Sequence, residues 1–331
     1  RAARDEAHRR LMGIFNEIPD KAKVSTIHAL CLHALNIPAD CLFERGSVKW
    51  KFYQTVTHDG LSNQKIKRTL GLYQRMRNDL SYTRVGLDFI RQDEDDDEVI
   101  TPGINGIMVD RYEEWKLEHG YIDFTSLLER VAAGEGTVQD YDVVIIDEAQ
   151  DLTVLQWKVM ERVYKSAATV YVVGDDDQSV YSFLGADVSM FLDWPCSVVR
   201  ILDQTHRLPQ EILDFSLKLA ARIQYRQEKA IHTKIPAHGV IQQAMLGRYL
   251  AFNVHPSELY LVRNEYMLHR VQDILSLDGI PYRGKHSPWM RYDVQAIQTI
   301  IDWKDRPLSA HDWKAIKKFL PKEVVSLIEG K

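Results

Sequence analysis

A short apolar run followed at once by two acids constrains the fold of this chain more than any other feature. Val143 to Ile146 are apolar without a break, and Asp147 and Glu148 come directly after them. Such a run is typical of a strand that is buried on both faces of a parallel sheet. Ligands of open α/β sheets lie outside the carboxyl ends of the strands, so we expect both acids beside a ligand.

Carboxylates at the end of a strand suit a nucleotide site. Mg²⁺ takes oxygen ligands, usually from one or two carboxylates and from substrate phosphates. A second acid beside the first can orient or deprotonate an attacking water. The alternative interpretation is an acidic helix start, because Asp and Glu are favoured at helix N-termini.

A second buried strand with polar residues at its end is expected at 169–173. The segment 174–186 follows it and carries Gln178, Tyr181 and Phe183. This segment is expected beside the two acids, because it also follows the carboxyl end of a strand. Gln178 can bond a phosphate oxygen or a water, and the aromatic side chains can stack on nucleic-acid bases.

Composition excludes some classes of protein and leaves others open. The 331 residues are enough for two or three domains, and 45% hydrophobic content is ordinary for a globular protein. No apolar run is long enough to span a bilayer, and no signal peptide is recognised, so we expect no membrane partner. The odd number of cysteines, without metal-ligand spacing, predicts a cytoplasmic protein. A net charge of −5 does not exclude a local basic groove for nucleic acid.

The region 36–102 is predicted to be a mainly helical insert. Basic residues alternate there with Tyr73 and Tyr82, which suits either a nucleic-acid surface or a solvated helix face. The basic residues are Lys65, Lys67, Arg68, Arg75 and Arg77. The acidic run 93–98 is expected to be an exposed loop.

Periodicity and capping signals predict the remaining elements. We expect helices at 107–119, 154–165, 209–225 and after 262, and strands at 197–201 and 258–262. Asp123 or Thr125 is a candidate helix cap, and the spacing of Thr153 and Gln156 predicts a capping box. Four residues of the last helix have core spacing: Met267, Val271, Ile274 and Leu275.

Two of these segments closely resemble motifs of the UvrD/Rep-type superfamily 1 DNA helicases. Asp147-Glu-Ala-Gln-Asp151 resembles the family's Walker B motif. Gly174-Asp-Asp-Asp-Gln-Ser-Val-Tyr-Ser-Phe-Leu-Gly-Ala186 resembles its third motif, which links the nucleotide to single-stranded DNA. The segments 1–11, 25–31 and 203–213 are similar to motifs Ia, Ib and IV.

The resemblance implies an α/β fold with RecA-like, parallel-sheet P-loop NTPase motor domains and helical insertions. Residues 1–35 and 103–200 would form the first motor domain, and 36–102 its helical insert. Residues 201–287 would begin the second motor domain, and 288–331 would begin a further helical subdomain. ATP would bind in the cleft between the two motor domains.

The resemblance also implies a role for each site residue. Asp147 would hold Mg²⁺, and Glu148 would activate the hydrolytic water. Gln178 would sense the γ-phosphate, and Arg207 would act as an arginine finger from the second motor domain. His206 stands where the family usually has a tyrosine that stacks on adenine. Beside His206, Gln204 is the other candidate for binding the nucleotide.

The same resemblance assigns DNA contacts to four residues. Thr26 and His28 would contact the DNA backbone, although a helix-capping Thr and a structural His explain the same pattern. Tyr181 and Phe183 would meet DNA bases.

Three departures from the family pattern are visible in the sequence. Leu184 stands where the family usually has arginine, which affects the coupling of ATP to DNA. No Gly-x-x-x-x-Gly-Lys-Ser/Thr loop occurs, and motifs V and VI are not found. The chain begins and ends within helical patterns, so we expect a piece of a longer protein. We therefore expect the 331-residue chain alone to hydrolyse ATP poorly or not at all.

The resemblance thus predicts an ATP-dependent DNA helicase or translocase with ATP and Mg²⁺ as cofactors. Its partners would be single-stranded DNA and duplex–single-strand junctions, with repair, replication or phage proteins as further candidates. One alternative is the helicase portion of a helicase-nuclease, which further sequence with a carboxylate cluster would distinguish. The other is a non-catalytic DNA-binding scaffold with a degenerate motor, which an intact phosphate-binding loop in a longer reading frame would exclude.

Overall fold

The computed structural model describes most of the chain in four stretches. These are residues 22–57, 62–83, 104–242 and 259–277, together with Arg9, Tyr282 and Trp313. The chain divides into two compact units, residues 1–239 and 240–331, each of which is described by itself. The acidic run 93–98, the predicted motif Ia segment 1–11 apart from Arg9, and nearly all of 288–331 lie outside the described residues.

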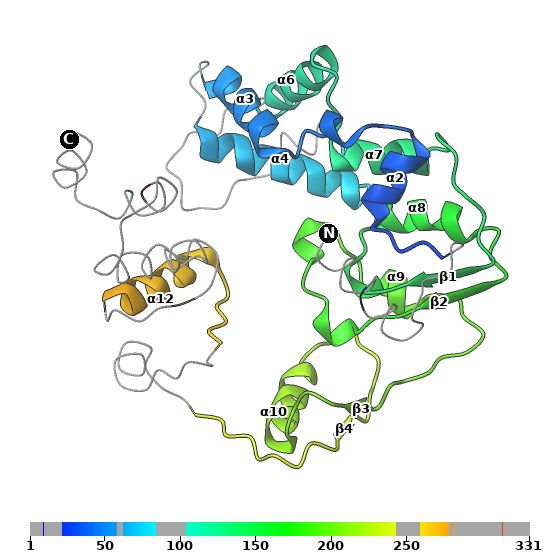
Figure 1. The fold of residues 1–331 in the computed structure, drawn as a ribbon, viewed down its shortest axis with the longest axis vertical. Coiled ribbons are helices and arrows are strands. Elements are labelled where there is room, and N and C mark those ends of the chain that lie inside the picture. Colours follow the sequence, from blue (N-terminus) through cyan, green and yellow to red (C-terminus); the bar gives the residue numbers. More distant parts are fainter. Residues whose placement is uncertain are drawn as a thin grey trace. The chain divides into compact units, whose positions relative to one another are not determined.

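A parallel pair of strands confirms the expected βαβ core of the first unit (Figure 1). β1 (Val143–Ile146) pairs with β2 (Thr169–Val172), with Val143 opposite Thr169 and Ile146 opposite Val172. The connection between them contains α8 (Val154–Tyr164), as a parallel crossover requires. Both strand ends therefore point to the same edge of the sheet.

The predictions that β1 is buried on both faces and that 169–173 is a buried strand are both wrong for the described residues. No residue of β2 is fully buried, and Tyr171 is 55% exposed. Val144 and Ile146 are buried, whereas Val143 and Ile145 are 52% and 68% exposed. The buried face packs on an apolar cluster that includes Trp157 of α8. Among the described residues, helices cover only this face of the sheet. The unbroken apolar run 143–146 therefore did not indicate that both faces of β1 are covered.

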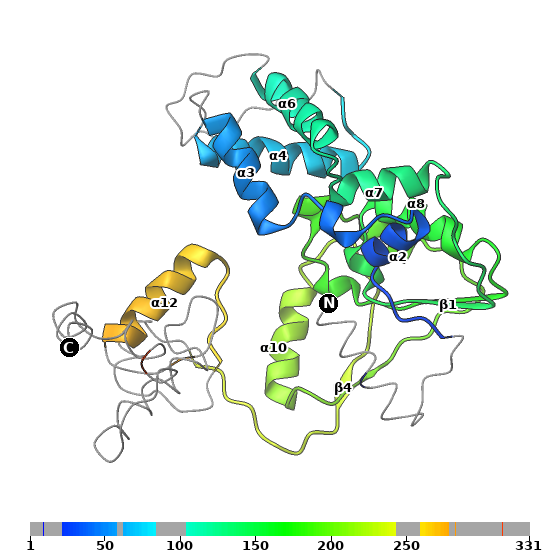
Figure 2. The ribbon, with the colours of Figure 1, turned by 45° about the horizontal axis from the view of Figure 1, so that its top comes forward.

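Two further helices join α8 in a second core. α2 (Ile27–Ala34) and α7 (Phe124–Ala132) pack against it and against each other (Figure 2). The buried residues are Cys31, Leu127, Leu128, Val131, Leu155 and Val159. The predicted capping box is confirmed, because Thr153 Oγ1 accepts from the Gln156 N–H and Gln156 Oε1 accepts from the Thr153 N–H. The predicted cap at Asp123 is confirmed as the N-cap of α7.

A third core lies within a group of three helices, α3 (Gly46–Thr57), α4 (Asn63–Asn78) and α6 (Ile104–Glu118). Aromatic rings dominate it, with Phe43, Phe52, Tyr112 and Trp115 in edge-to-face contacts. Such contacts add to the stabilisation from buried apolar area. The predicted helix 107–119 is confirmed as α6. This core includes α6, which lies after the predicted end of the insert at residue 102. The limits of the motor domain and the insert stay predictions.

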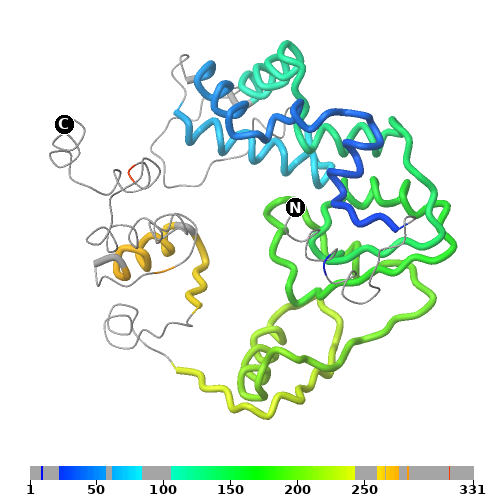
Figure 3. The backbone as a smooth tube through the Cα atoms, in the orientation of Figure 1, coloured from blue at the N-terminus to red at the C-terminus, as the bar shows by residue number. Residues whose placement is uncertain are grey.

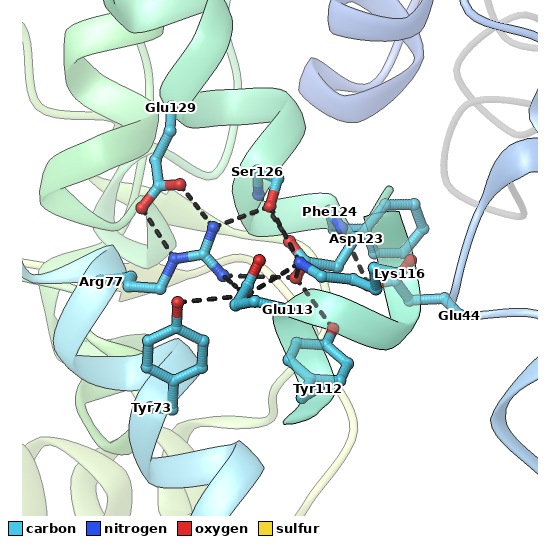
Figure 4. Close-up of polar contacts among 10 residues, drawn as sticks. All are labelled: Glu44, Tyr73, Arg77, Tyr112, Glu113, Lys116, Asp123, Phe124, Ser126 and Glu129. Atoms are coloured by element: carbon cyan, nitrogen blue, oxygen red, sulfur yellow. Dashed lines mark hydrogen bonds and ion pairs between the residues drawn. The ribbon is translucent and has the colours of Figure 1, made fainter. Parts of the chain in front are cut away.

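Buried charges join this helical group to α7 (Figure 4). Asp123 is fully buried, and its Oδ2 accepts from Arg77 Nη1 of α4 at 3.2 Å and from Tyr112 Oη at 2.8 Å. Lys116 of α6 pairs with the same oxygen, and Arg77 also binds Glu129 of α7. One carboxylate therefore ties three helices together, as the sticks in Figure 4 show.

This network corrects the interpretation of the basic residues in the insert. Arg77 and Tyr73 are buried, so they form neither a solvated helix face nor a nucleic-acid surface. Lys67, Arg68 and Arg75 are exposed. Sequence periodicity did not distinguish Arg77, because its acidic partners Asp123 and Glu129 lie more than forty residues away.

A second parallel pair follows further along the first unit. β3 (Gln204–Thr205) pairs with β4 (His232–Thr233), and α10 (Gln210–Ala220) lies between them in sequence. Figure 3 follows this part of the backbone in yellow-green. The unit also contains short helical turns. These are η1 (Ala39–Cys41), η2 (Ala149–Asp151), η3 (Asp176–Gln178), η4 (Ser182–Leu184) and α9 (Ser189–Leu192).

Two predictions in this region are wrong. The segment 197–201 is not a strand, and Val198 and Val199 are 67% and 69% exposed. A strand needs backbone partners, and none of the described segments bonds to it. Helix α10 ends at Ala220 rather than near Tyr225, and Pro209 is its N-cap rather than a residue of its first turn.

In the second unit, α12 (Glu265–Leu277) is the described helix. Val271 and Leu275 are buried against Tyr260 and Val262, as their spacing predicted, but Met267 is 42% exposed. The predicted strand 258–262 is not formed over its described residues. Burial alternates there as in a strand, but no described strand pairs with it.

We predict that Asp123→Asn destabilises the first unit by about 3–5 kcal/mol, because Arg77 and Lys116 would lose their shared counter-charge in a buried site. Urea unfolding of the purified chain measures this loss. Glu114→Gln, at an exposed position of α6, is the control and should change the free energy of unfolding by less than about 0.5 kcal/mol. Equal effects of the two changes would contradict the proposed importance of the network.

The same carboxylate predicts a pH dependence. Burial opposes its charge, but Arg77 and Lys116 outweigh burial, so the pKa of Asp123 lies well below its ordinary value. A carboxyl whose pKa is lower in the folded state stabilises the fold above its unfolded pKa of about 3.9. Stability should therefore fall as the pH drops below that value, and Asp123→Asn should flatten this part of the profile.

Candidate nucleotide and nucleic-acid site

The two predicted catalytic acids lie at the carboxyl end of β1, and both are exposed. Asp147 Oδ1 accepts from the Glu148 N–H at 3.0 Å. No described residue bonds the other oxygen of Asp147, so this oxygen can bind a ligand. A free carboxylate oxygen at a strand end fits Mg²⁺, whose remaining ligands would be phosphates and waters.

Glu148 has an unusual backbone conformation. Its φ of 54° and ψ of 41° lie in the left-handed region, which is uncommon for residues other than glycine. Neighbouring bonds hold it there: the Ala149 N–H donates to the Val173 carbonyl at 3.0 Å, and the Val173 N–H donates to the Ile146 carbonyl at 2.8 Å. Backbone strain of this kind is concentrated at functional sites, which supports a role for Glu148.

Gln150 connects the two strand ends, although the sequence reasoning gave it no role. Its side chain is almost fully buried, and its Nε2 donates to Glu148 Oε2 at 2.7 Å. Its Oε1 accepts from the Asp175 N–H at 3.0 Å, in the loop that follows β2. An amide flanked by acids in a turn after a strand was the available signal, but its partner across the sheet was not visible in the sequence.

Gly174 makes this contact possible. A Cβ atom at this position would lie 2.5 Å from Gln150 Oε1, closer than van der Waals contact allows. Ser179 Oγ adds a further bond between the loops after β1 and β2, because it donates to the Gln150 carbonyl at 3.3 Å. The loops after β1 and β2 are therefore held together at both the side chain and the backbone of Gln150.

Gln178 lies in η3 with its side chain exposed, and its Nε2 donates to Asp175 Oδ2 at 2.5 Å. The structure thus brings Gln178 into one bonded group with Glu148, through Asp175 and Gln150. The confirmed placement of the polar segment beside the two acids follows from the parallel pairing of β1 and β2.

The two predicted base-stacking residues form an exposed pair. The ring centroids of Tyr181 and Phe183 are 6.1 Å apart, and the side chains are 43% and 60% exposed. Leu184, at 47% exposed, adjoins them. Gly185 follows with a φ of 93° and lies against the end of α4, where a Cβ would be 3.2 Å from Asn78 Cβ.

The third set of predicted residues follows β3. Gln204 Nε2 lies 3.2 Å from His206 Nε2, and the Arg207 N–H donates to Thr205 Oγ1 at 3.3 Å. The side chains of His206 and Arg207 are exposed. Within the described residues, no bond joins Arg207 to the loops after β1 or β2, so the structure does not bring Arg207 into the group around Glu148.

Ion pairs nevertheless link the β2 loop to the segment that follows α10. Arg226 binds Asp177 through two bonds, from Nε to Oδ1 at 2.7 Å and from Nη2 to Oδ2 at 2.8 Å. Lys229 Nζ contacts all three consecutive aspartates, reaching Asp175 Oδ1 at 2.6 Å and Asp177 Oδ2 at 3.1 Å. Asp176 is the most buried of the three.

These contacts lower the pKa of two of the aspartates. The hydrogen bond from Arg226 is the main cause for Asp177. For Asp175, burial opposes ionisation, but hydrogen bonds from Lys229 and Gln178 outweigh it. The charged forms of Asp175 and Asp177 are therefore the stable ones at neutral pH.

The two residues of the predicted DNA-backbone contact have structural roles. Thr26 is the N-cap of α2, and its Oγ1 accepts from the Ala29 N–H at 3.3 Å, so the capping interpretation is confirmed. The His28 ring lies 4.5 Å from the Phe124 ring, and burial lowers the pKa of His28. Contact of either residue with DNA stays a prediction.

Comparison with known proteins now identifies the family. The model of the UvrD/REP helicase N-terminal domain matches residues 1–195, which is more than half of the chain. The chain belongs to the UvrD/Rep helicase family. The resemblance carried by the Asp147–Asp151 and 174–186 motifs is thereby confirmed.

Individual relatives agree with this assignment. The chain is 26% identical over 315 residues to the ATP-dependent DNA helicase UvrD1 of Mycobacterium bovis, which covers 85% of this chain and 39% of that protein. It is 33% identical over 95 residues to YjcD of Bacillus subtilis, covering 26% of this chain and 12% of YjcD. It is 36% identical over 90 residues to the RecBCD enzyme subunit RecB of Buchnera aphidicola, covering 25% and 8%. The chain thus spans well under half the length of these relatives.

Two further observations concern the described parts of this family member. None of its described helices is long and apolar enough to cross a membrane. No group of three or more His, Cys, Asp or Glu side chains is arranged there to hold a metal ion. The fold is mixed helix and strand with parallel pairing, as the family assignment leads us to expect.

We predict that Lys229→Met destabilises the chain by about 3 kcal/mol, because three neighbouring aspartates would lose their shared cation. Chemical denaturation at pH 7 measures this change. Lys234→Met, at an exposed position nearby, is the control and should cost less than about 0.5 kcal/mol. Stability should also fall below pH ~4, because the folded-state pKa values of Asp175 and Asp177 lie below their unfolded values. If Lys229→Met and Lys234→Met change the free energy of unfolding equally, Lys229 does not stabilise the three aspartates.

Proposed function

We propose that this chain is part of an ATP-dependent DNA helicase in which single-stranded DNA stimulates ATP hydrolysis. Hydrolysis would drive translocation and strand separation. The observation that carries the proposal is the bonded connection between Glu148 and the loop that bears Gln178, Tyr181 and Phe183. Family membership and the similarity to UvrD1 support it.

The chemistry at the strand ends supports this assignment. Asp147 would hold Mg²⁺, which would neutralise charge on the ATP phosphates, and Glu148 would orient and deprotonate the attacking water. Gln178 contacts the γ-phosphate. Arg207 would stabilise the charge on the phosphates from the second motor domain. Gln204 and His206 would bind the nucleotide, with His206 stacking on the adenine.

Single-stranded DNA is the proposed polymer, and its junction with duplex is the proposed point of strand separation. The exposed rings of Tyr181 and Phe183 suit base stacking, which contributes about 1–3 kcal/mol per base. Thr26 and His28 would contact the DNA backbone at the start of α2. Repair, replication or phage proteins are the proposed protein partners.

The proposed fold is RecA-like, with the motor-domain and insert limits expected from the sequence. The parallel βαβ unit of β1, α8 and β2 supports it. We also propose a cytoplasmic location, which three free cysteines support, because disulfides are rare in that compartment.

One observation favours a second candidate function. Leu184 stands in place of the family's usual arginine and is exposed beside the aromatic pair. A DNA-binding scaffold without ATP turnover would need the aromatic pair but not that arginine. The helicase portion of a helicase-nuclease stays a prediction.

We predict that the complete gene product that contains these residues hydrolyses ATP and that single-stranded DNA stimulates the rate. Glu148→Gln should lower the stimulated rate at least about a hundredfold, because the amide cannot take a proton from water. Nucleotide affinity should stay within about threefold, since the carboxylate acts on water rather than on binding. Steady-state turnover and nucleotide titration measure the two quantities.

Glu161→Gln is the matched control, because Glu161 is exposed on α8. It should leave turnover and affinity unchanged. If the unsubstituted protein binds DNA but shows no turnover with or without DNA, the helicase assignment fails and the scaffold becomes the better account.

A further inference from the structure

The side-chain amide of Gln150 forms two hydrogen bonds, one through its nitrogen and one through its oxygen. The nitrogen donates to the Glu148 carboxylate at 2.7 Å, and the oxygen accepts from the Asp175 N–H at 3.0 Å. Gln150 is 1% exposed, although the Glu148 carboxylate that it contacts is itself exposed. A buried amide held at both ends is fixed in one orientation.

We propose that Gln150 is a positioning residue that sets the place of the Glu148 carboxylate according to the state of the loop after β2. The proposal rests on the proposed function, because it assigns Glu148 to ATP hydrolysis and the loop to DNA. It goes beyond that function by naming the physical link between the two sites.

The chemistry of this position selects an amide. The link needs a donor toward a carboxylate and an acceptor toward a backbone N–H, and the two ends of a glutamine amide supply both. A bond to an ionised acceptor is stronger than one between neutral groups, so Glu148 is held firmly. Gly174 leaves room for the amide oxygen, which a larger residue there would displace.

Asp175 carries the link into the loop. Its N–H meets Gln150, its Oδ2 accepts from Gln178 Nε2 at 2.5 Å, and its Oδ1 accepts from Lys229 Nζ at 2.6 Å. Displacement of Asp175 therefore acts on Gln178 and, through Gln150, on Glu148. Tyr181 and Phe183 lie six and eight residues after Asp175 in the same loop. Bases that stack on these rings would therefore shift the position of Asp175.

Two substitutions separate the bonds of Gln150. Gln150→Met keeps an unbranched side chain of similar length and removes both hydrogen bonds. Gln150→Glu keeps an acceptor for the Asp175 N–H, but it removes the donor and places a second carboxylate against Glu148. Gln156→Glu is the matched control, because Gln156 uses only its acceptor oxygen in the capping box and that oxygen is retained.

The first measurement uses the 331-residue chain and does not depend on activity. Amide hydrogen exchange at Asp175 should be about fivefold faster or more in Gln150→Met, because a hydrogen bond of this kind is lost. It should stay within about twofold of the unsubstituted chain in Gln150→Glu and in Gln156→Glu.

The second measurement uses the complete gene product. Both Gln150 variants should lower the kcat for ATP about tenfold or more, leave KM within about threefold, and reduce the stimulation by single-stranded DNA toward one. Gln156→Glu should leave all three values unchanged. A split between kcat and KM, together with lost stimulation, is the signature of positioning.

Other outcomes overturn the proposal or the function on which it rests. If the Gln150 variants lose melting temperature and lower basal and stimulated rates by the same factor, Gln150 is a structural residue only. If turnover and stimulation stay within twofold, the link does not exist, while the helicase assignment stands. If the unsubstituted protein has no turnover, the proposed function fails and the positioning role fails with it, whereas the exchange result still shows whether the contact is present.

Discussion

The parallel pairing of β1 with β2 is the constraint on which the site depends. It places two polar loops, far apart in sequence, at one edge of the sheet. Gln150 then joins them, because its amide bonds both the Glu148 carboxylate and the Asp175 N–H. Without the pairing, the acids after β1 and the glutamine and aromatic residues after β2 would be separate features.

Buried or half-buried charge connects this site to the rest of the first unit. Asp123 ties the three-helix group to α7, which packs on α8 and so supports β1. The aspartates after β2 are paired with Lys229 in the segment that leads into β4. Both connections cost desolvation, and both are strongly disrupted when one partner is removed. Such arrangements favour rigid, well-defined geometry around the strand ends.

Local patterns predicted β1, β2, most of the helices, the caps and the family, because periodicity and motif spacing are properties of neighbouring residues. The two strands, the Thr153 capping box and the Asp123 cap were all predictable. Long-range facts were not: the burial of Arg77, the exposure of Val143 and Ile145, and the bridge made by Gln150 each depend on residues distant in sequence. The strand expected at 197–201 failed for the same reason, because an apolar segment becomes a strand only beside a partner. The roles of Arg207 and His206 stay predictions.

The central claim is that the nucleotide and DNA sites are energetically coupled through the β1 and β2 loops. The most direct test is the affinity of the complete gene product for a fluorescent single-stranded oligonucleotide, with and without Mg²⁺ and a non-hydrolysable ATP analogue. Coupling is reciprocal, so the nucleotide should change DNA affinity by about fivefold or more, and DNA should change nucleotide affinity by the same factor. Binding of both ligands with unchanged affinities would contradict the account.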